Sequence, residues 1–277
     1  MEVILAKTMG FCFGVNRSIE LVNKAIADGK KNIQILGPIV HNPQQIKDLE
    51  SKGVKMVDEI DQLAPGTVFV RAHGVSPEVL DRLRKRKGME VIDATCPFVK
   101  LEQDYARKLK DEGYNVVIIG EKKHPEALGV QGFAEGSVII GSVDEAKEMK
   151  ITTKLGVVVQ TTLEPESVDK IVAELYLKAQ ELRVYNTICR ATRERQPAAK
   201  ELAQKVDLML VVGGKNSGNT RRLAEVCSRL TKTHHIETAD ELEKGWFKGA
   251  KSVGVTAGAS TPDFVINEVL DKLKSFG

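Results

Sequence analysis

The chain has 277 residues, of which 42% are hydrophobic, so it is long enough to bury a sizeable core. Its 41 basic and 38 acidic residues give a formal net charge of only +3, and aromatic residues make up 5%, which argues against nucleic acid as the main partner. No apolar run is long enough to cross a bilayer, no secretory signal opens the sequence, and four cysteines are too few for a disulfide scaffold, so we expect a cytoplasmic protein with reduced thiols.

The sequence contains a threefold internal repeat. Cys12, Cys96 and Cys189 lie 84 and 93 residues apart, close to a third of the chain. Each cysteine is followed by a segment that we predict to be helical and then by a short apolar strand that ends in glycine. The predicted helices are 15–27, 99–111 and 192–206, and the predicted first strands are 33–37, 116–120 and 208–213.

Further strands follow in each repeat. After a polar loop, a second helix and a second strand, the predicted third strands are 68–73, 156–161 and 252–257. Fourth strands at 90–96 and 183–189 run into the next cysteine, but the last repeat ends in its helix, 261–276. Because an uncovered strand edge is a liability, we predict that the amino-terminal strand 2–6 pairs in parallel with 252–257.

Strands that alternate with helices indicate βαβ units and parallel sheets. Runs such as VVII and LMLVV are typical of strands that are buried on both faces. We therefore predict an α/β fold of three similar small parallel-sheet domains in a pseudo-threefold arrangement around a central site, for which the cysteines described below favour an iron-sulfur centre. If each domain has the strand order 2-1-3-4, its ligand crevice lies between strands 1 and 3. The domains are residues 12–95, 96–188 and 189–277, the last completed by the amino-terminal segment 1–11.

Histidine, serine and threonine recur at the strand ends where open parallel sheets bind ligands. One residue per repeat stands four positions after the glycine of the first strand, and another follows the third strand. These residues are His41, His124 and Ser217, and His73, Thr161 and Ser260. Their equivalent positions favour a shared site over isolated structural roles, whereas His234 and His235 are expected to be structural or exposed.

The repeated cysteines are candidate metal ligands, and we expect them to converge. Three thiolates suit a four-iron cluster with one open iron or a zinc ion with one open position. We favour the cluster, because a catalytic zinc held by three cysteines is less usual and a cluster can also deliver electrons. Cys227 lies on a helical apolar stripe and is assigned to the core.

The remaining loops indicate an anionic ligand. Residues 213–220, GGKNSGNT, form a glycine-rich turn that opens a helix, where backbone N–H groups favour phosphate. Joined by His41, His73 and Ser260, this turn predicts a diphosphate pocket. Glu126 follows His124 across a proline; on an open loop it would be a solvated carboxylate, and inside a closed pocket a proton donor.

Taken together, these motifs resemble those of the 4-hydroxy-3-methylbut-2-enyl diphosphate reductase family, which catalyses the last step of the non-mevalonate isoprenoid pathway. The resemblance covers nearly the whole chain. It is carried by GFCFGV at Cys12, GPIVHN at His41, RAHGVS at His73, DATCP at Cys96, HPE at 124–126, QTTL at 160–163, TIC at Cys189, GGKNSGNT and GVTAGAS.

The resemblance implies roles for individual residues. Cys12, Cys96 and Cys189 would hold one [4Fe–4S] cluster whose open fourth iron binds the substrate hydroxyl. The diphosphate would be held by five polar residues, which are His41, His73, Ser217, Asn219 and Ser260. His124 and Thr161 would lie nearer the hydroxyl. Glu126 would deliver the proton with help from Thr161. Gly218 stands where many relatives have serine, so it offers only its backbone amide.

The implied reaction is a reductive dehydroxylation that yields isopentenyl and dimethylallyl diphosphate. The sequence lacks a flavin or nicotinamide fingerprint, so ferredoxin or flavodoxin is the expected electron donor. Two alternatives stay open: a redox-neutral hydro-lyase or hydrolase that uses the metal only as a Lewis acid, and a non-enzymatic iron-sulfur sensor. Only the reductase requires a low-potential donor, and a sensor would need a partner-binding patch. The sequence predicts no oligomeric state.

Overall fold

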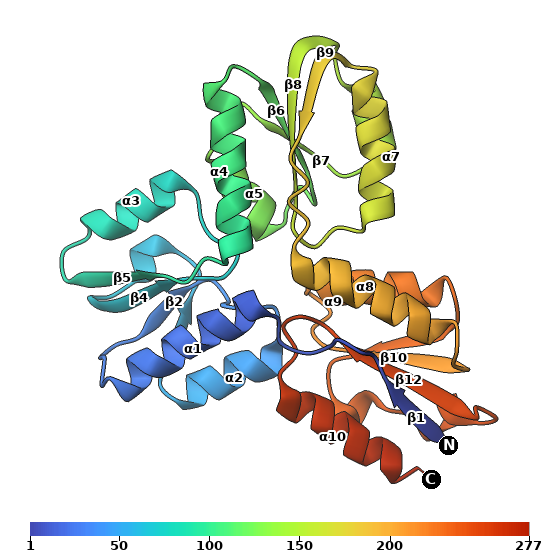
Figure 1. The fold of residues 1–277 in the computed structure, drawn as a ribbon. Helices are drawn as coiled ribbons and strands as arrows, with labels where there is room; N and C mark the ends of the chain where they lie inside the picture. Colours follow the sequence, from blue (N-terminus) through green and yellow to red (C-terminus); the bar gives the residue numbers. More distant parts are fainter. Residues whose placement is uncertain (277) are drawn as a thin grey trace. The chain divides into compact units, whose positions relative to one another are not determined.

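The protein, described here by a computed structural model of residues 1–276, contains three four-stranded sheets whose strands all run parallel (Figure 1). Helices connect the strands and cover the sheets, which confirms the predicted α/β class. No helix within residues 1–276 has the length and apolar character needed to cross a membrane.

The first sheet has the order 2-1-3-4, written β3-β2-β4-β5 along the chain. Its strands are β2 (Gln34–Leu36), β3 (Lys55–Val57), β4 (Gly66–Val70) and β5 (Met89–Asp93). Helix α3 (Pro77–Lys85) and the short helix η1 (Ile60–Gln62) pack on one face. There Leu83 is fully buried against Leu36, Val68 and Val70, which point to the same side because alternate residues of a strand share a face.

The second sheet repeats this order as β7-β6-β8-β9. Its strands are β6 (Asn115–Ile119), β7 (Val138–Ile140), β8 (Thr152–Val159) and β9 (Ala179–Val184). Helices α4 (Pro97–Asp111) and α5 (Pro125–Gln131) cover one face, and α6 (Val143–Glu148) and α7 (Pro165–Tyr176) cover the other (Figure 1). Apolar residues on both faces keep the central strands β6 and β8 out of water.

The third sheet joins the two ends of the chain, in the order β1-β12-β10-β11. Its strands are β1 (Glu2–Leu5), β10 (Leu208–Val212), β11 (Lys232–Ile236) and β12 (Ser252–Ala257). Helices α8 (Arg190–Ala203) and α9 (Gly218–Ser228) cover one face, and α10 (Asp263–Lys274), η2 (Ala239–Glu241) and η3 (Lys244–Phe247) cover the other.

The amino-terminal strand occupies the fourth place of this sheet, as the repeat predicts. Glu2, Val3, Ile4 and Leu5 pair in parallel with residues 252–255, and the amide of Ala6 donates to the carbonyl of Val255 at 2.9 Å. Val3 and Ile4 pack against the apolar clusters on opposite faces of the sheet. The strand therefore covers the edge of β12 that would otherwise present unpaired backbone groups.

Deletion of residues 1–7 is expected to destabilise the third sheet selectively. Each lost ladder hydrogen bond should cost about 0.5–1.5 kcal/mol, and the edge of β12 becomes open to water. Hydrogen exchange measured residue by residue should show faster exchange for amides of β12 and β10, with amides of β4 and β8 as internal controls. Equal acceleration in all three sheets would contradict this assignment.

The described residues fall into two compact units. One comprises residues 1–16, 40–52 and 190–276, and the other comprises 17–39 and 53–189. The first unit thus contains the third sheet together with helix α2 (Pro43–Ser51), which the repeat assigns to the first domain; helix α1 (Phe13–Ala27) begins in the first unit and continues in the second. The division into domains 12–95, 96–188 and 189–277 stays a prediction.

The strands that lead to the cysteines are shorter than predicted. Strand β5 ends at Asp93, because the Asp93 carboxylate accepts hydrogen bonds from the amide and the hydroxyl of Thr95 and turns the chain. Strand β9 ends at Val184, and beyond it the hydroxyl of Thr187 pairs with the backbone of Val159. Short turns therefore separate the last strand from Cys96 and Cys189.

Candidate functional site

The three repeated cysteines occupy equivalent backbone positions. Each directly precedes the first residue of a helix: Cys12 before α1, Cys96 before α4 and Cys189 before α8. Each cysteine amide also donates to the carbonyl that lies two residues beyond the third strand of its sheet. These acceptors are Ala259 for Cys12 at 3.1 Å, Ala72 for Cys96 at 2.9 Å and Thr161 for Cys189 at 3.0 Å. The repeat thus extends to the hydrogen bonds that fix the cysteine backbone.

The chemistry of these thiols fits an anionic metal centre. The amino-terminal end of a helix carries partial positive charge and suits a negatively charged ligand. Cys12, Cys96 and Cys189 are half-buried, and none of the four cysteines forms a disulfide within the described residues. Cys227, by contrast, is fully buried in an apolar cluster, and this burial raises its pKa to about 12, so it lies in the core as predicted.

Arg195 supports the loop that carries Cys12. Its side chain is buried on α8 and donates to the carbonyls of Gly10 and Phe11 at 2.9 and 3.1 Å. A buried guanidinium that bonds two successive carbonyls fixes the backbone just before the cysteine. The sequence analysis missed this residue, although an arginine on the buried face of an amphipathic helix is a recognisable signal.

Glu126, His124 and Thr161 form a buried hydrogen-bonded group. The Glu126 carboxylate accepts from the Thr161 amide at 2.6 Å through Oε1 and from the Thr161 hydroxyl at 3.0 Å through Oε2. His124 caps helix α5, and its Nδ1 accepts from the amide of Glu126 at 3.2 Å, which places the proton of the neutral ring on Nε2. Glu126 is only 2% exposed and is therefore not a solvated surface carboxylate.

Burial controls the protonation of Glu126. Removal from water raises the pKa of Glu126, and the two hydrogen bonds from Thr161 oppose this rise without cancelling it. The side chain can therefore keep a proton at a higher pH than an ordinary glutamate does. His73, which follows β4, lies beside the same group, with its ring edge-on to that of His124 and the centroids 5.5 Å apart.

A second acid, Glu102, lies next to Glu126 and was missed by the sequence analysis. It occupies the buried face of α4 between Val99 and Ala106 and is 0% exposed. Burial and the neighbouring carboxyl of Glu126 raise the pKa of Glu102 well above its usual value. The signal that could have revealed it is the position of a glutamate on the apolar stripe of an amphipathic helix.

A second group of predicted residues assembles around the glycine-rich turn of the third sheet. Ser217 caps α9, and its Oγ lies 3.4 Å from that of Ser260. The hydroxyl of Ser260 also lies 3.4 Å from the carbonyl of His41, and Asn219 Oδ1 accepts from the amide of Ala259 at 2.9 Å. Gly218 is the first residue of α9, so its amide belongs to the helix end that favours anions.

A close backbone approach joins His41 to this turn. A Cβ atom at Gly214 would lie 2.1 Å from the carbonyl oxygen of His41, so only glycine fits without movement of the backbone. Gly213, with φ of 138°, adopts a conformation that other residues rarely reach, and a Cβ there would lie 2.2 Å from the Thr261 hydroxyl. Gly214 thus lets the His41 segment lie against the Ser217 turn, and Gly213 lets the same turn lie against Thr261.

Gly214→Ala is expected to separate His41 from Ser217. The displaced backbone should lower the free energy of unfolding by about 1–3 kcal/mol, the usual range for overpacking. Urea denaturation of the variant measures this loss. Gly245→Ala is the matched control, because a Cβ there meets nothing within 4 Å, and it should change stability by less than about 0.5 kcal/mol. Equal stability of the two variants would contradict the close approach.

His234 and His235, which the sequence analysis did not assign to the shared site, make structural contacts. His234 stacks on Trp246 with the centroids 3.8 Å apart, and His235 Nε2 lies 2.8 Å from the carbonyl oxygen of Gly213. Burial lowers the pKa of both rings. Their structural role therefore agrees with the prediction.

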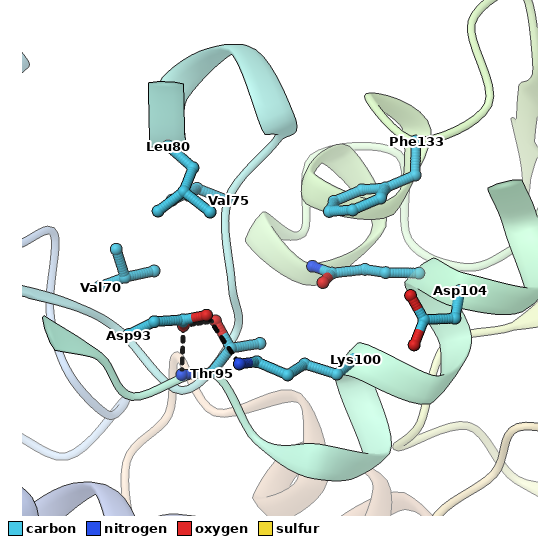
Figure 2. Close-up of a pocket in the computed structure, with 9 residues that line it drawn as sticks. Val70, Val75, Leu80, Asp93, Thr95, Lys100, Asp104 and Phe133 are labelled. Atoms are coloured by element: carbon cyan, nitrogen blue, oxygen red, sulfur yellow. Dashed lines mark hydrogen bonds and ion pairs between the residues drawn. The ribbon is translucent and has the colours of Figure 1, made fainter. Parts of the chain in front are cut away.

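A small pocket of about 160 Å³ lies beside the turn that leads to Cys96 (Figure 2). Asp93 and Lys100 form an ion pair at 2.7 Å on one side, and Val75, Leu80 and Phe133 supply apolar walls. Burial opposes the ionisation of Asp93, but hydrogen bonds from Lys100 and Thr95 outweigh it and lower the pKa of Asp93. This network holds the turn, and the pocket contains none of the predicted site residues.

Comparison with known proteins places the chain in a well-defined group. A family model described as LytB protein matches residues 3–274. A 4-hydroxy-3-methylbut-2-enyl diphosphate reductase of Geobacter sulfurreducens is 49% identical and covers 100% of this chain and 98% of its own length. The protein of the same name from Pelobacter propionicus is 48% identical and covers 99% of this chain and 98% of its own length.

Solved structures give the same grouping. A structure of (E)-4-hydroxy-3-methyl-but-2-enyl diphosphate reductase, described as the terminal enzyme of the non-mevalonate pathway, is 42% identical with a TM-score of 0.71 and covers 99% of this chain and 100% of its own. The E-1-hydroxy-2-methyl-but-2-enyl-4-diphosphate reductase from Plasmodium falciparum is 30% identical with a TM-score of 0.94 and covers 99% of this chain and 88% of its own.

Proposed function

Because the chain belongs to the LytB protein family, we propose that it acts as a 4-hydroxy-3-methylbut-2-enyl diphosphate reductase in the final step of the non-mevalonate isoprenoid pathway. The reaction breaks the allylic C–O bond and forms a C–H bond. It consumes two electrons and two protons, releases water, and yields isopentenyl and dimethylallyl diphosphate. The names of the relatives favour this reading over a redox-neutral hydro-lyase or a sensor.

The observation that carries the proposal is the equivalence of the three cysteines. Each begins a helix and is held through its amide by the carbonyl beyond the third strand, and all three are half-buried and outside disulfides. Three such thiols fit the ligand set of a [4Fe–4S] cluster that leaves one iron open. When bound, such a cluster supplies electrons and a Lewis-acidic iron for the substrate hydroxyl.

The diphosphate of the substrate fits the loops around the helix starts. Ser217, Gly218 and Asn219 lie at the amino-terminal end of α9, where amide groups and the helix dipole favour phosphate oxygens. His41 and Ser260 lie beside this turn, and the resemblance assigns His73 to the same ligand. We propose that these residues bind the diphosphate and orient the allylic alcohol.

Glu126 is the proposed proton donor. Hydroxide is a poor leaving group, so the departing oxygen needs a proton as the C–O bond breaks. The buried Glu126 carboxyl can retain this proton, and the hydroxyl of Thr161 is placed to pass it on through the 3.0 Å hydrogen bond. His124, with a proton on Nε2, can donate a hydrogen bond to the substrate.

We also propose that the electron donor is a small low-potential protein, ferredoxin or flavodoxin, and that the reaction takes place in the cytoplasm. Protein purified without oxygen should contain iron and acid-labile sulfide, show visible absorption, and convert the diphosphate substrate only when a low-potential reductant is present. Stoichiometric zinc with full activity would contradict the cluster. Turnover without any reductant would favour the hydro-lyase, and iron binding without turnover would favour the sensor.

A further inference from the structure

Glu102 and Glu126 form a buried pair of carboxyl groups. Glu102 comes from α4 and Glu126 from α5, the two helices that cover the same face of the second sheet. Their side chains are 0% and 2% exposed, and the two carboxyl groups are close enough for each to shift the pKa of the other. No N–H or O–H of another described residue donates to either oxygen of Glu102.

This pair must hold a proton. Two ionised carboxylates repel each other and cannot form a hydrogen bond, because neither has a donor. Burying an ionised carboxylate without a cation or hydrogen-bond donors is so unfavourable that such a group stays neutral instead. Like charges that share a site therefore retain one proton between them.

The two members of the pair have different surroundings. Both oxygens of Glu126 accept hydrogen bonds from Thr161, which stabilise its ionised form. Glu102 has no such support, so a proton shared by the two lies preferentially on Glu102. When both acids are protonated, Glu126 therefore gives up its proton first, and Glu102 keeps the proton that can replace it.

We propose that Glu102 is a proton reserve for Glu126. After Glu126 transfers its proton, the O–H bond of Glu102 breaks and that proton forms an O–H bond with the neighbouring Glu126 carboxylate, which restores the acid and leaves the charge on Glu102. This inference rests on the proposed function, whose reaction consumes two protons. Glu102 does not itself reach the substrate and acts through Glu126.

Other titratable groups face the pair. The negative charge of Glu121, in the loop after β6, raises the pKa of Glu126 further. His124 lies at the start of α5 with its Nδ1 bonded to the Glu126 amide, and the ring of His73 lies edge-on to it. Because this hydrogen bond already occupies Nδ1, a neutral His124 has no free acceptor with which to take the proton that Glu102 holds.

A titration of the carboxyl groups tests the pair without any measurement of activity. In anaerobically purified protein with ¹³C-labelled glutamate side chains, NMR should show two coupled protonation steps, of which the second is displaced upward by more than about one pH unit. Glu102→Gln should reduce these to a single step of Glu126. Glu126→Gln should likewise leave a single protonation step, which belongs to Glu102. If Glu102→Gln does not fold, the titration of Glu126→Gln tests the coupling of the two acids instead.

The pH dependence of turnover tests the reserve itself. Glu102→Gln keeps the size of the side chain and donates a hydrogen bond to Glu126 but holds no transferable proton. The fall of turnover at high pH should therefore begin at least about one pH unit lower than in the wild type. Asp111→Asn, an exposed acid at the end of the same helix, is the control and should leave the profile unchanged.

Three outcomes overturn the inference: independent titration of the two acids near ordinary values, an unchanged Glu126 titration in Glu102→Gln, or an unchanged pH profile in that variant. Coupled titration in a protein that does not reduce the diphosphate substrate would instead confirm the pair and contradict the proposed function. The NMR and turnover measurements thus separate the two proposals.

Discussion

Replacement of Cys96 by serine is expected to abolish the iron content of the protein and its reductase activity. Serine keeps the shape of the side chain but replaces a thiolate with a hydroxyl, which is a poor ligand for an iron-sulfur cluster. The backbone at this position is held by the 2.9 Å hydrogen bond to Ala72, so the fold around residue 96 should persist. Iron and sulfide analysis and visible absorption of anaerobically purified protein measure the loss.

Cys227→Ser is the matched control for Cys96→Ser. Cys227 lies in the apolar cluster between α8 and α9, and its Sγ is 3.9 Å from the carbonyl oxygen of Ala199. A hydroxyl there can use the same carbonyl, so the folded variant should contain as much iron as the wild type. Loss of iron in Cys227→Ser, or full iron content in Cys96→Ser, would contradict the assigned ligand set.

Glu126→Gln is expected to reduce turnover by about 10²–10⁴-fold, the range typical for loss of a general acid. Glutamine keeps the size of the side chain and can still accept the hydrogen bond from the Thr161 amide, but it carries no acidic proton. Substrate affinity should be retained, because the diphosphate is assigned to other loops. Single-turnover kinetics together with equilibrium binding of the substrate separate these two effects.

The pH dependence of the wild type follows from the same burial. Because removal from water raises the pKa of Glu126, turnover should persist to a higher pH than an ordinary glutamate would allow and should fall as the pH rises through that raised value. The residual rate of Glu126→Gln should lack this fall. Glu135→Gln alters an exposed acid close to α5 and should match the wild type. A wild-type rate in Glu126→Gln would show that Glu126 has only a structural role.

Much of the fold follows from the repeat. The three four-stranded parallel sheets and the placement of residues 2–5 beside β12 could be predicted, because both depend on counting strands and on the need to cover an edge. The ends of β5 and β9 could not, since side chains such as Asp93 compete for the backbone locally. The grouping of residues 40–52 with the third sheet also escaped prediction, because it depends on contacts between distant segments, such as the close approach of His41 to Gly214.

The residues of the candidate site likewise fall into those that the sequence predicts and those that it does not. Equivalent positions in three repeats pointed to the cysteines and the histidines, and the resemblance added Asn219 and the role of Glu126. Glu102 has no counterpart in that pattern, since its importance comes from the packing of α4 against α5, which joins positions 24 residues apart. Arg195 escaped for the same reason, because its partners Gly10 and Phe11 are 185 and 184 residues away.

The pairing of β1 with β12 makes the order of synthesis matter. Residues 2–5 leave the ribosome first, and their partners at 252–255 are added last, about 10–50 s later at usual rates of translation. Until then Cys12 lacks the Ala259 carbonyl that fixes its backbone. A truncated chain would therefore contain all three cysteines but hold Cys12 without this backbone support, so the framework of equivalent cysteines is complete only when the carboxyl-terminal strand has been made.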